Sequence, residues 1–137
     1  AIDIHHNDVN RELHLGTWVW VHRKGAIKAD AGRKGIVPGA MGRNSFIVEG
    51  RGNPHSFSSS SHGAGRAMSR KKALRSFSQN DVMRELQQNK VLLCKKQLKD
   101  VAEEAPKAYK DIHFVMEQQQ DLIHIKNRLT GIAVIKG

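Results

Sequence analysis

The sequence predicts an α+β fold, and three observations carry this prediction. Runs of β-branched and aromatic residues, which favour strands, lie between segments of good helix formers. These segments do not alternate regularly, as a sheet of βαβ units would require, and no internal repeat is present. The 137 residues are enough for a real core, so we expect a single domain over residues 1–137 with mixed or antiparallel strands and a few helices.

The N-terminal half is predicted to consist of strands and loops. The expected strands cover residues 2–7, 17–21, 27–31 and 45–48, and glycine-rich or polar loops cover residues 32–42 and 50–61. The third strand is expected to return antiparallel to the second after a basic turn. Trp18 and Trp20 share one face of the second strand, where we expect core packing rather than a stacking platform for nucleobases.

The C-terminal half is predicted to contain the helices. The expected helices cover residues 66–77, a segment from about 78 to 88, and residues 111–120, the last with Ile112, Val115 and Met116 on one face. The expected strands cover residues 91–94, 122–129 and 132–135, the last of them buried, with a turn at residues 130–131 and an irregular connection over residues 100–107. Cys94, in the apolar run 91–94, is expected to be a buried thiol.

Charge is the most informative part of the composition. The chain has 23 Lys and Arg against 13 Asp and Glu, a net charge of +10. The excess lies between residues 22 and 75, which hold 12 basic and two acidic side chains, and most of the glycines fall in the same region. Flexible backbone that coincides with positive charge is typical of a phosphate or polyanion site.

Cysteine use and hydropathy indicate the compartment. A single cysteine excludes an intramolecular disulfide and favours a reducing environment. No stretch approaches 18 consecutive apolar residues, and no secretory leader opens the sequence. We therefore expect a soluble, cytoplasmic protein.

Residues 58–70 are the stretch around which the chain is organised. Four serines precede His62, Gly63 and Gly65 follow it, and Arg66 and Arg70 lie four residues apart. If a helix begins after Gly65, its free N–H groups favour an anion, and the two arginines project from one face. This pattern predicts a nucleophile or ligand for phosphorus chemistry. A basic loop with an incidental exposed histidine remains the alternative.

A metal site is less clearly indicated. His5 and His6 are adjacent and would point to opposite sides of an extended segment, so only one of them would face a given site. Neutral imidazole is a common ligand for manganese and zinc, but the chain has no CxxC or HExxH spacing. The glycine-rich loop over residues 32–42 does not match the P-loop pattern either.

Six motifs, taken together, resemble those of the RtcB family of RNA-splicing ligases. They occur in the family's order and cover essentially the whole chain, and the similarity is to the C-terminal third of the family's longer sequence, so we expect a fragment. The motifs occupy residues 5–7, 22–26, 37–42, 61–70, 108–112 and 134–137.

This resemblance implies a particular reaction. Ligases of this family join an RNA 3′-phosphate or 2′,3′-cyclic phosphate to a 5′-hydroxyl with GTP and manganese. The family's motif makes His62 the nucleophile, which attacks the α-phosphate of GTP and carries GMP. A histidine suits this role because it keeps a neutral, nucleophilic nitrogen near neutral pH.

The resemblance also implies the roles of other residues. His6 matches a manganese ligand, and Asn7 matches a nucleotide contact. Arg66 and Arg70 are expected to hold RNA phosphates, and Arg23 and Lys24 to guide the RNA backbone. The positions expected to surround guanosine or its phosphates are Asn7, Pro38, Gly39, Ala40, Met41, Ser45, His62, Gly63, Ala64, Gly65, Tyr109 and Lys136.

Two departures from the family pattern limit what this chain would do alone. The family often has serine where this chain has Ala40, so one hydroxyl contact to the nucleotide is expected to be missing. The cysteine, aspartate and further histidines of the metal site belong to the family's N-terminal part, so this chain alone is expected to be inactive.

The partners follow from the same resemblance. We expect RNA, such as tRNA halves or broken RNA ends, and an activating archease-type protein. A non-catalytic basic RNA-binding module and a structural RNA-associated protein of ribosomal type are the alternative interpretations of the charge.

Overall fold

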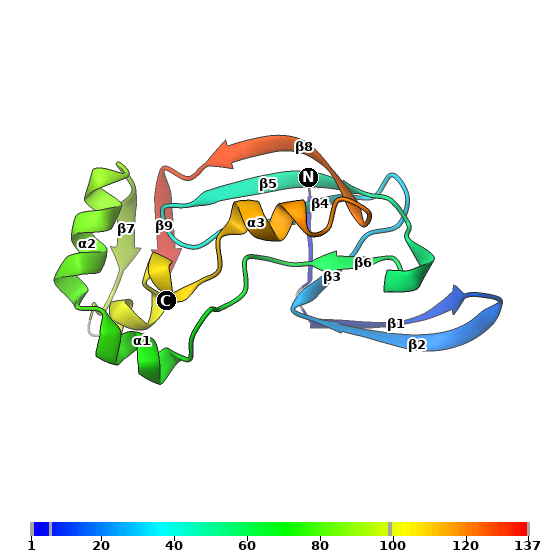
Figure 1. Cartoon of the computed structure of the whole chain (residues 1–137), viewed down its shortest axis with the longest axis horizontal. Coiled ribbons are helices and arrows are strands. Elements are labelled where there is room, and N and C mark those ends of the chain that lie inside the picture. The colour runs from blue at the N-terminus through cyan, green and yellow to red at the C-terminus, as the bar shows by residue number, and fades with distance from the viewer. Residues whose placement is uncertain (1, 6, 99, 137) are drawn as a thin grey trace.

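The computed structural model describes residues 2–5, 7–98 and 100–136, and it confirms the predicted α+β class (Figure 1). The strands are β1 (Asn7–His14), β2 (Thr17–Lys24), β3 (Ala26–Lys28), β4 (Lys34–Val37), β5 (Asn44–Gly50), β6 (Ser59–Ser61), β7 (Leu92–Lys95), β8 (Ile123–Thr130) and β9 (Ala133–Lys136). The helices are α1 (Arg70–Ser76), α2 (Gln79–Gln88) and α3 (Ile112–Glu117), with 3₁₀ turns at η1 (Pro54–Ser56), η2 (Val101–Glu104) and η3 (Pro106–Ala108).

The first core lies between an antiparallel sheet and a helix. Strands β4, β5 and β8 pair in that order, and α3 packs against this sheet (Figure 1). Ile112 and Met116 are buried and Val115 is half-buried, so the predicted apolar face of this helix is confirmed. The cluster comprises Ile27, Ala29, Val37, Phe46, Val48, Ala64, Ile112, Met116 and Ile123.

The second core joins α1, α2, η2, η3 and the parallel pair β7–β9. Ser78 begins α2 with a capping box, since its hydroxyl accepts from the Asp81 N–H at 3.1 Å and the Asp81 carboxylate accepts from the Ser78 N–H at 3.2 Å. The cluster comprises Met41, Ala73, Val82, Leu86, Val91, Val101, Ala105 and Ala108. Tyr109 packs against both cores and therefore marks the junction between them.

Strands β1 and β2 form an antiparallel hairpin that projects from the rest of the molecule (Figure 1). Its polar face is turned inward, where Glu12 and Arg23 are buried and paired. Its apolar face is turned outward, so Trp18 is 59% and Trp20 is 72% exposed. The prediction that these tryptophans are core residues was wrong, because the charged pair, rather than the aromatic face, anchors the hairpin.

Several expected strands of the N-terminal half also differ in the structure. Residues 2–5 form no strand, and the first strand instead begins at Asn7. The return strand β3 pairs with β6 rather than with β2, and β4 lies inside the segment expected to be a loop. The serine run forms β6 by pairing with β3, and the buried Gln119 side chain hydrogen-bonds both the N–H and the hydroxyl of Ser61 at 2.9 Å.

The C-terminal half agrees better with prediction, with the following corrections. The first helix begins at Arg70 rather than at residue 66, since Ser69 caps it by accepting from the Lys72 N–H. Helix α3 ends at Glu117. Strands β8 and β9 belong to different sheets, and β9 is not buried, with Ile135 85% exposed. The Cys94 thiol is exposed rather than buried, because it lies on the open side of the two-stranded sheet β7–β9.

Within the described part of the chain, no helix has the length and apolar character that crossing a membrane requires.

Candidate functional site

His62 lies directly after β6, between the base of the hairpin and the loop that follows β4. Its backbone N–H donates to the Gly25 carbonyl at 3.3 Å, and the Ala64 N–H donates to the Pro38 carbonyl at 3.3 Å. A Cβ added to Gly63 would lie 3.1 Å from that same Pro38 oxygen. Glycine therefore lets the His62 segment run close against the Pro38 loop, and the imidazole is half-buried there.

The helix expected to begin beside His62 begins eight residues later. Residues 63–69 are irregular, and α1 has only seven residues. The predicted start of the helix directly behind His62 was therefore wrong, and the N-terminus of α1 does not adjoin His62. The local glycines favour irregular backbone over helix here.

A cleft of about 290 Å³ brings together most of the positions expected to surround guanosine. The predicted residues that line it are Pro38, Gly39, Ala40, Met41, Ser45, Tyr109 and Lys136. They come from the loop between β4 and β5, the start of β5, the residue after η3, and the end of β9. The wall is completed by Gly42, Arg43, Glu104, Gly131, Ala133 and Val134. Asn7 and residues 62–65 are not part of its lining; residues 62–65 border its Pro38 wall.

Glu104 is the central residue of this cleft, and sequence reasoning missed it. Its Oε2 accepts from Lys136 Nζ at 2.8 Å and from the Tyr109 hydroxyl at 2.5 Å. Its Oε1 accepts from Arg70 Nη1 at 2.6 Å and lies 3.5 Å from Arg66 Nη1. Four residues that the sequence singled out thus meet at one carboxylate. An acid within an irregular segment gives no sequence signal for such a role.

The surroundings of Glu104 keep it ionised. Burial alone would raise its pKa, but hydrogen bonds from Lys136 and Tyr109, together with the positive charges of Lys136 and Arg70, hold the pKa at about 2. The carboxylate therefore carries its negative charge throughout the neutral range, and three cations and a phenol are arranged around it.

Tyr109 contacts this cluster from the junction of the two cores. Its hydroxyl donates to Glu104 and accepts from Arg66 Nη1 at 3.1 Å, and the Arg66 guanidinium lies 4.9 Å from the ring centre. Burial first, and then the hydrogen bond and charge of Glu104, raise the pKa of Tyr109. Tyr109 is therefore a neutral phenol near neutral pH.

Arg66 and Arg70 converge as predicted, although not from one helix face. Only Arg70 belongs to α1, while Arg66 precedes the helix and donates to the Met68 carbonyl at 3.0 Å and to the Glu103 carbonyl. Arg70 also pairs with the Glu103 carboxylate at 2.8 Å. Its side chain remains 60% exposed, so it can still meet a phosphate from solvent.

Arg23 and Lys24, both expected to guide RNA, lie differently. Arg23 is 2% exposed, and its guanidinium binds both oxygens of Glu12, at 2.7 and 2.8 Å, as well as Ser59 Oγ and the Phe57 carbonyl. These internal contacts occupy the donors that RNA would need. Lys24 is exposed and lies opposite Asn7 in the pairing of β1 with β2. It immediately precedes Gly25 in the chain.

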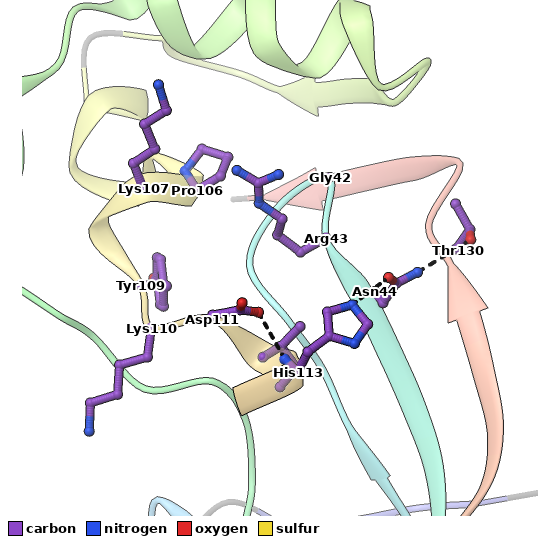
Figure 2. Close-up of a pocket in the computed structure, with 11 residues that line it drawn as sticks. Gly42, Arg43, Asn44, Pro106, Lys107, Tyr109, Lys110, Asp111, His113 and Thr130 are labelled. Atoms are coloured by element: carbon purple, nitrogen blue, oxygen red, sulfur yellow. Dashed lines mark hydrogen bonds between the residues drawn. The ribbon is translucent and has the colours of Figure 1, made fainter. Parts of the chain in front are cut away.

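A second cleft, of about 480 Å³, adjoins the first (Figure 2). The two share Gly42, Arg43 and Tyr109. Figure 2 shows the His113 ring directed at Asn44, whose Oδ1 lies 3.0 Å from His113 Nε2, while the Asn44 amide reaches the Thr130 hydroxyl at 3.4 Å. Arg43, Lys107 and Lys110 make this cleft basic.

The described residues do not form a metal site. No group of three or more His, Cys, Asp or Glu side chains that could hold an ion is found among residues 2–5, 7–98 and 100–136. The expected manganese ligand, His6, lies outside the described residues. The part of the chain that the structure describes therefore does not fit a manganese ion by itself.

The fold is of the α+β class, and one cleft gathers several of the motif residues. Comparison with known proteins identifies the family. The sequence model of the tRNA-splicing ligase RtcB family matches residues 1–137. This chain belongs to the RtcB family.

Individual relatives agree with this assignment. The chain is 48% identical over 136 residues to the RNA-splicing ligase RtcB of Escherichia coli K12, covering 99% of this chain and 32% of that protein. It is 36% identical over 156 residues to the tRNA-splicing ligase RtcB of Methanococcus maripaludis, covering 98% of this chain and 32% of that protein. The chain thus spans about a third of the length of the curated relatives that it matches.

Proposed function

We propose that this chain is the nucleotide-accepting portion of a GTP-dependent RNA ligase that joins 3′-phosphate or 2′,3′-cyclic phosphate ends to 5′-hydroxyl ends. The observation that carries the proposal is the cleft of about 290 Å³, in which seven of the twelve guanosine positions implied by the family motifs lie together. The His62 segment runs against the Pro38 wall of this cleft, so a nucleotide held there would lie close to the imidazole.

The first proposed step is transfer of GMP to His62. An imidazole nitrogen attacks the α-phosphorus, a P–N bond forms, and the P–O bond to the β-phosphate breaks, so that pyrophosphate leaves with the electron pair. An RNA 3′-phosphate oxygen then attacks the same phosphorus and releases His62. Finally, the 5′-hydroxyl attacks the activated 3′-phosphorus, loses its proton, and displaces GMP.

The cleft residues have distinct roles in this scheme. Lys136 offers an ammonium donor to the acceptor atoms of the guanine edge, O6 and N7. Tyr109 provides a neutral ring and hydroxyl at the cleft wall. The Nη1 of Arg70 pairs with Glu104, but the side chain stays largely exposed. Its guanidinium is therefore suited to bind a phosphate through two parallel hydrogen bonds.

In this proposal, manganese binds only when the rest of a family ligase is present. The described residues do not fit the ion alone, so we place its further ligands in the two thirds of the family's length that this chain does not span. RNA with the ends named above is the proposed partner.

Covalent labelling tests the proposal. The chain is incubated with manganese and GTP labelled at the α-phosphate, alone and together with the remaining part of a family ligase, and the modified residue is mapped by mass. We expect label on His62 in the second arrangement, none in His62→Ala, and undiminished label in His124→Ala, which removes an exposed histidine of β8. Label that persists in His62→Ala would overturn the assignment.

A non-catalytic RNA-binding module is the second candidate, favoured by the basic segment over residues 22–75. It predicts RNA affinity that falls steeply with salt and no covalent label in either arrangement.

A further inference from the structure

The hairpin β1–β2 has an outward face whose two tryptophans have no role in the steps above. Alternation along the two strands places the side chains of Asn7, Val9, Arg11, Leu13, Trp18, Trp20, His22 and Lys24 on this face, and all of them are exposed. The hairpin's two acids, Asp8 and Glu12, both lie on the opposite face. The outward face is therefore aromatic and basic, without a carboxylate.

The two tryptophans have a spacing that suits nucleobases. Residues two apart on one strand face are about 6.8 Å apart, which is twice the rise of about 3.4 Å between stacked bases. Arg11 lies beside them, with its guanidinium 5.3 Å from the Trp18 ring centre. Exposed aromatic rings flanked by cations are the usual platform for single-stranded nucleic acid.

The face is also continuous with the proposed nucleophile. Strand β2 runs from Trp18 through Trp20 and His22 to Lys24, and the next residue, Gly25, accepts the hydrogen bond from the His62 N–H. From Trp20 to Lys24 the strand advances about 13 Å, a length that a few nucleotides cover. An RNA end at His62 would thus have its adjoining bases over the tryptophans.

We propose that this outward face binds the single-stranded RNA that adjoins the end being joined. Trp18 and Trp20 stack on bases, while Arg11 and Lys24 meet phosphates. The inference rests on the proposed function. Charge complementarity favours RNA, because this face carries Arg11 and Lys24 and has no acid that would repel phosphate.

Intrinsic fluorescence gives a test confined to this face, since Trp18 and Trp20 are the only tryptophans of the chain. Oligouridine is titrated into the chain without GTP, so the result does not depend on covalent labelling of His62. We expect quenching of the tryptophan emission. We also expect anisotropy of labelled oligouridine to show at least about fivefold weaker binding for Trp18→Leu and Trp20→Leu.

Further variants separate stacking from simple apolar contact. Leucine keeps the face apolar, whereas Trp20→Phe keeps an aromatic ring and should recover most of the affinity that Trp20→Leu loses. Arg11→Ala should reduce the slope of log affinity against log salt by about 0.7, the value for one phosphate on a single strand. Phe114→Leu, at an exposed aromatic residue of α3, is the matched control and should bind as the parent does.

Four results would overturn the inference. These are RNA binding without quenching, no RNA binding at all, leucine variants that bind as well as the parent, and tryptophans that become inaccessible to acrylamide on self-association or within a full-length family ligase. The last result would assign the face to a second copy or to the rest of the ligase. Failure of His62 labelling, by contrast, would overturn the proposed reaction and leave this binding face standing.

Discussion

The Nζ of Lys136 lies 2.8 Å from Oε2 of Glu104, and this contact joins the end of β9 to η2 across the cleft. The same carboxylate holds Tyr109 on one oxygen and Arg70 on the other. The residues assigned to guanine and the arginines assigned to RNA phosphates are therefore arranged around one anion. A change at Glu104 should affect both sides together.

Replacing Glu104 by glutamine should weaken GMP binding by about tenfold or more. Glutamine keeps the size but removes the charge, and hydrogen bonds to charged groups contribute about 1.5–3 kcal/mol each. Lys136 and Tyr109 would then lose the partner that orients them. Calorimetric titration with GMP measures the effect in a family ligase that contains this chain.

Glu103→Gln is the matched control for that variant. Its carboxylate also pairs with Arg70, at 2.8 Å, but no contact of it with Lys136 or Tyr109 is found among the described residues. It removes one negative charge from the adjacent position and should change GMP affinity less than threefold. Equal losses in the two variants would show that overall charge, and not positioning by Glu104, sets the affinity.

Tyr109 allows the Glu104 contact to be measured directly, because it is the single tyrosine of the chain. Burial and the Glu104 carboxylate raise its pKa above the ordinary value of 10.0. Ultraviolet absorbance of the phenolate should therefore show a titration shifted to alkaline pH, and Glu104→Gln should move it back towards the ordinary value. A titration that is the same in the variant would contradict the contact.

The linked effect on stability has a definite sign. A raised pKa in the folded state means that folding favours the protonated phenol, so this contribution is present below pH 10 and is lost as the pH rises through the raised pKa. Glu104→Gln should make this alkaline loss smaller.

The sequence located the cleft more accurately than it located the elements around it. Residues 38–41, Tyr109 and Lys136 belong to short motifs that resemble those of the family. The structure brings these residues together in one cleft. Glu104 was missed because its partners come from segments up to 38 residues away, and no spacing within η2 points to them.

The tryptophans show a different limit of sequence reasoning. Period-two alternation correctly placed Trp18 and Trp20 on one face, but it does not tell which face of a strand meets the body of the protein. That choice depends on the pairing of Glu12 with Arg23, eleven residues apart, and on the contacts of Arg23 with Ser59 and Phe57. Side-chain partners this distant in sequence leave no periodic signal.

The Glu12–Arg23 pair should be a major determinant of hairpin stability. Removing one partner leaves the other charge buried, which typically costs about 3–5 kcal/mol, so Glu12→Gln should destabilise the fold by about that amount. Chemical denaturation followed by circular dichroism measures it. Glu49→Gln, which breaks a surface pair with Lys126, should cost less than about 1 kcal/mol. Similar costs in both variants would contradict the buried role.

The same pair predicts sensitivity to acid. The hydrogen bond from Arg23 holds the pKa of Glu12 well below its ordinary value of 4.5, despite the opposing effect of burial. This stabilisation is therefore present above pH 4.5 and is lost as the pH falls towards the lowered value. In Glu12→Gln, stability should depend less on pH in that acidic range, and an unchanged dependence would show that other carboxylates dominate it.

Gly39 should tolerate no side chain, because the loop that it belongs to folds back on itself at the cleft. A Cβ there would lie 2.2 Å from the Asn44 carbonyl oxygen and 3.1 Å from the Arg43 Cβ, so the backbone would have to move. Overpacking of this kind costs about 1–3 kcal/mol, and Gly39→Ala should lower the free energy of unfolding by that amount. Gly131→Ala supplies the comparison within the same cleft, since a Cβ at Gly131 meets no atom within 4 Å. If both alanine variants unfold at the same denaturant concentration as the parent, the close approach of Gly39 to Asn44 is not a feature of the folded protein.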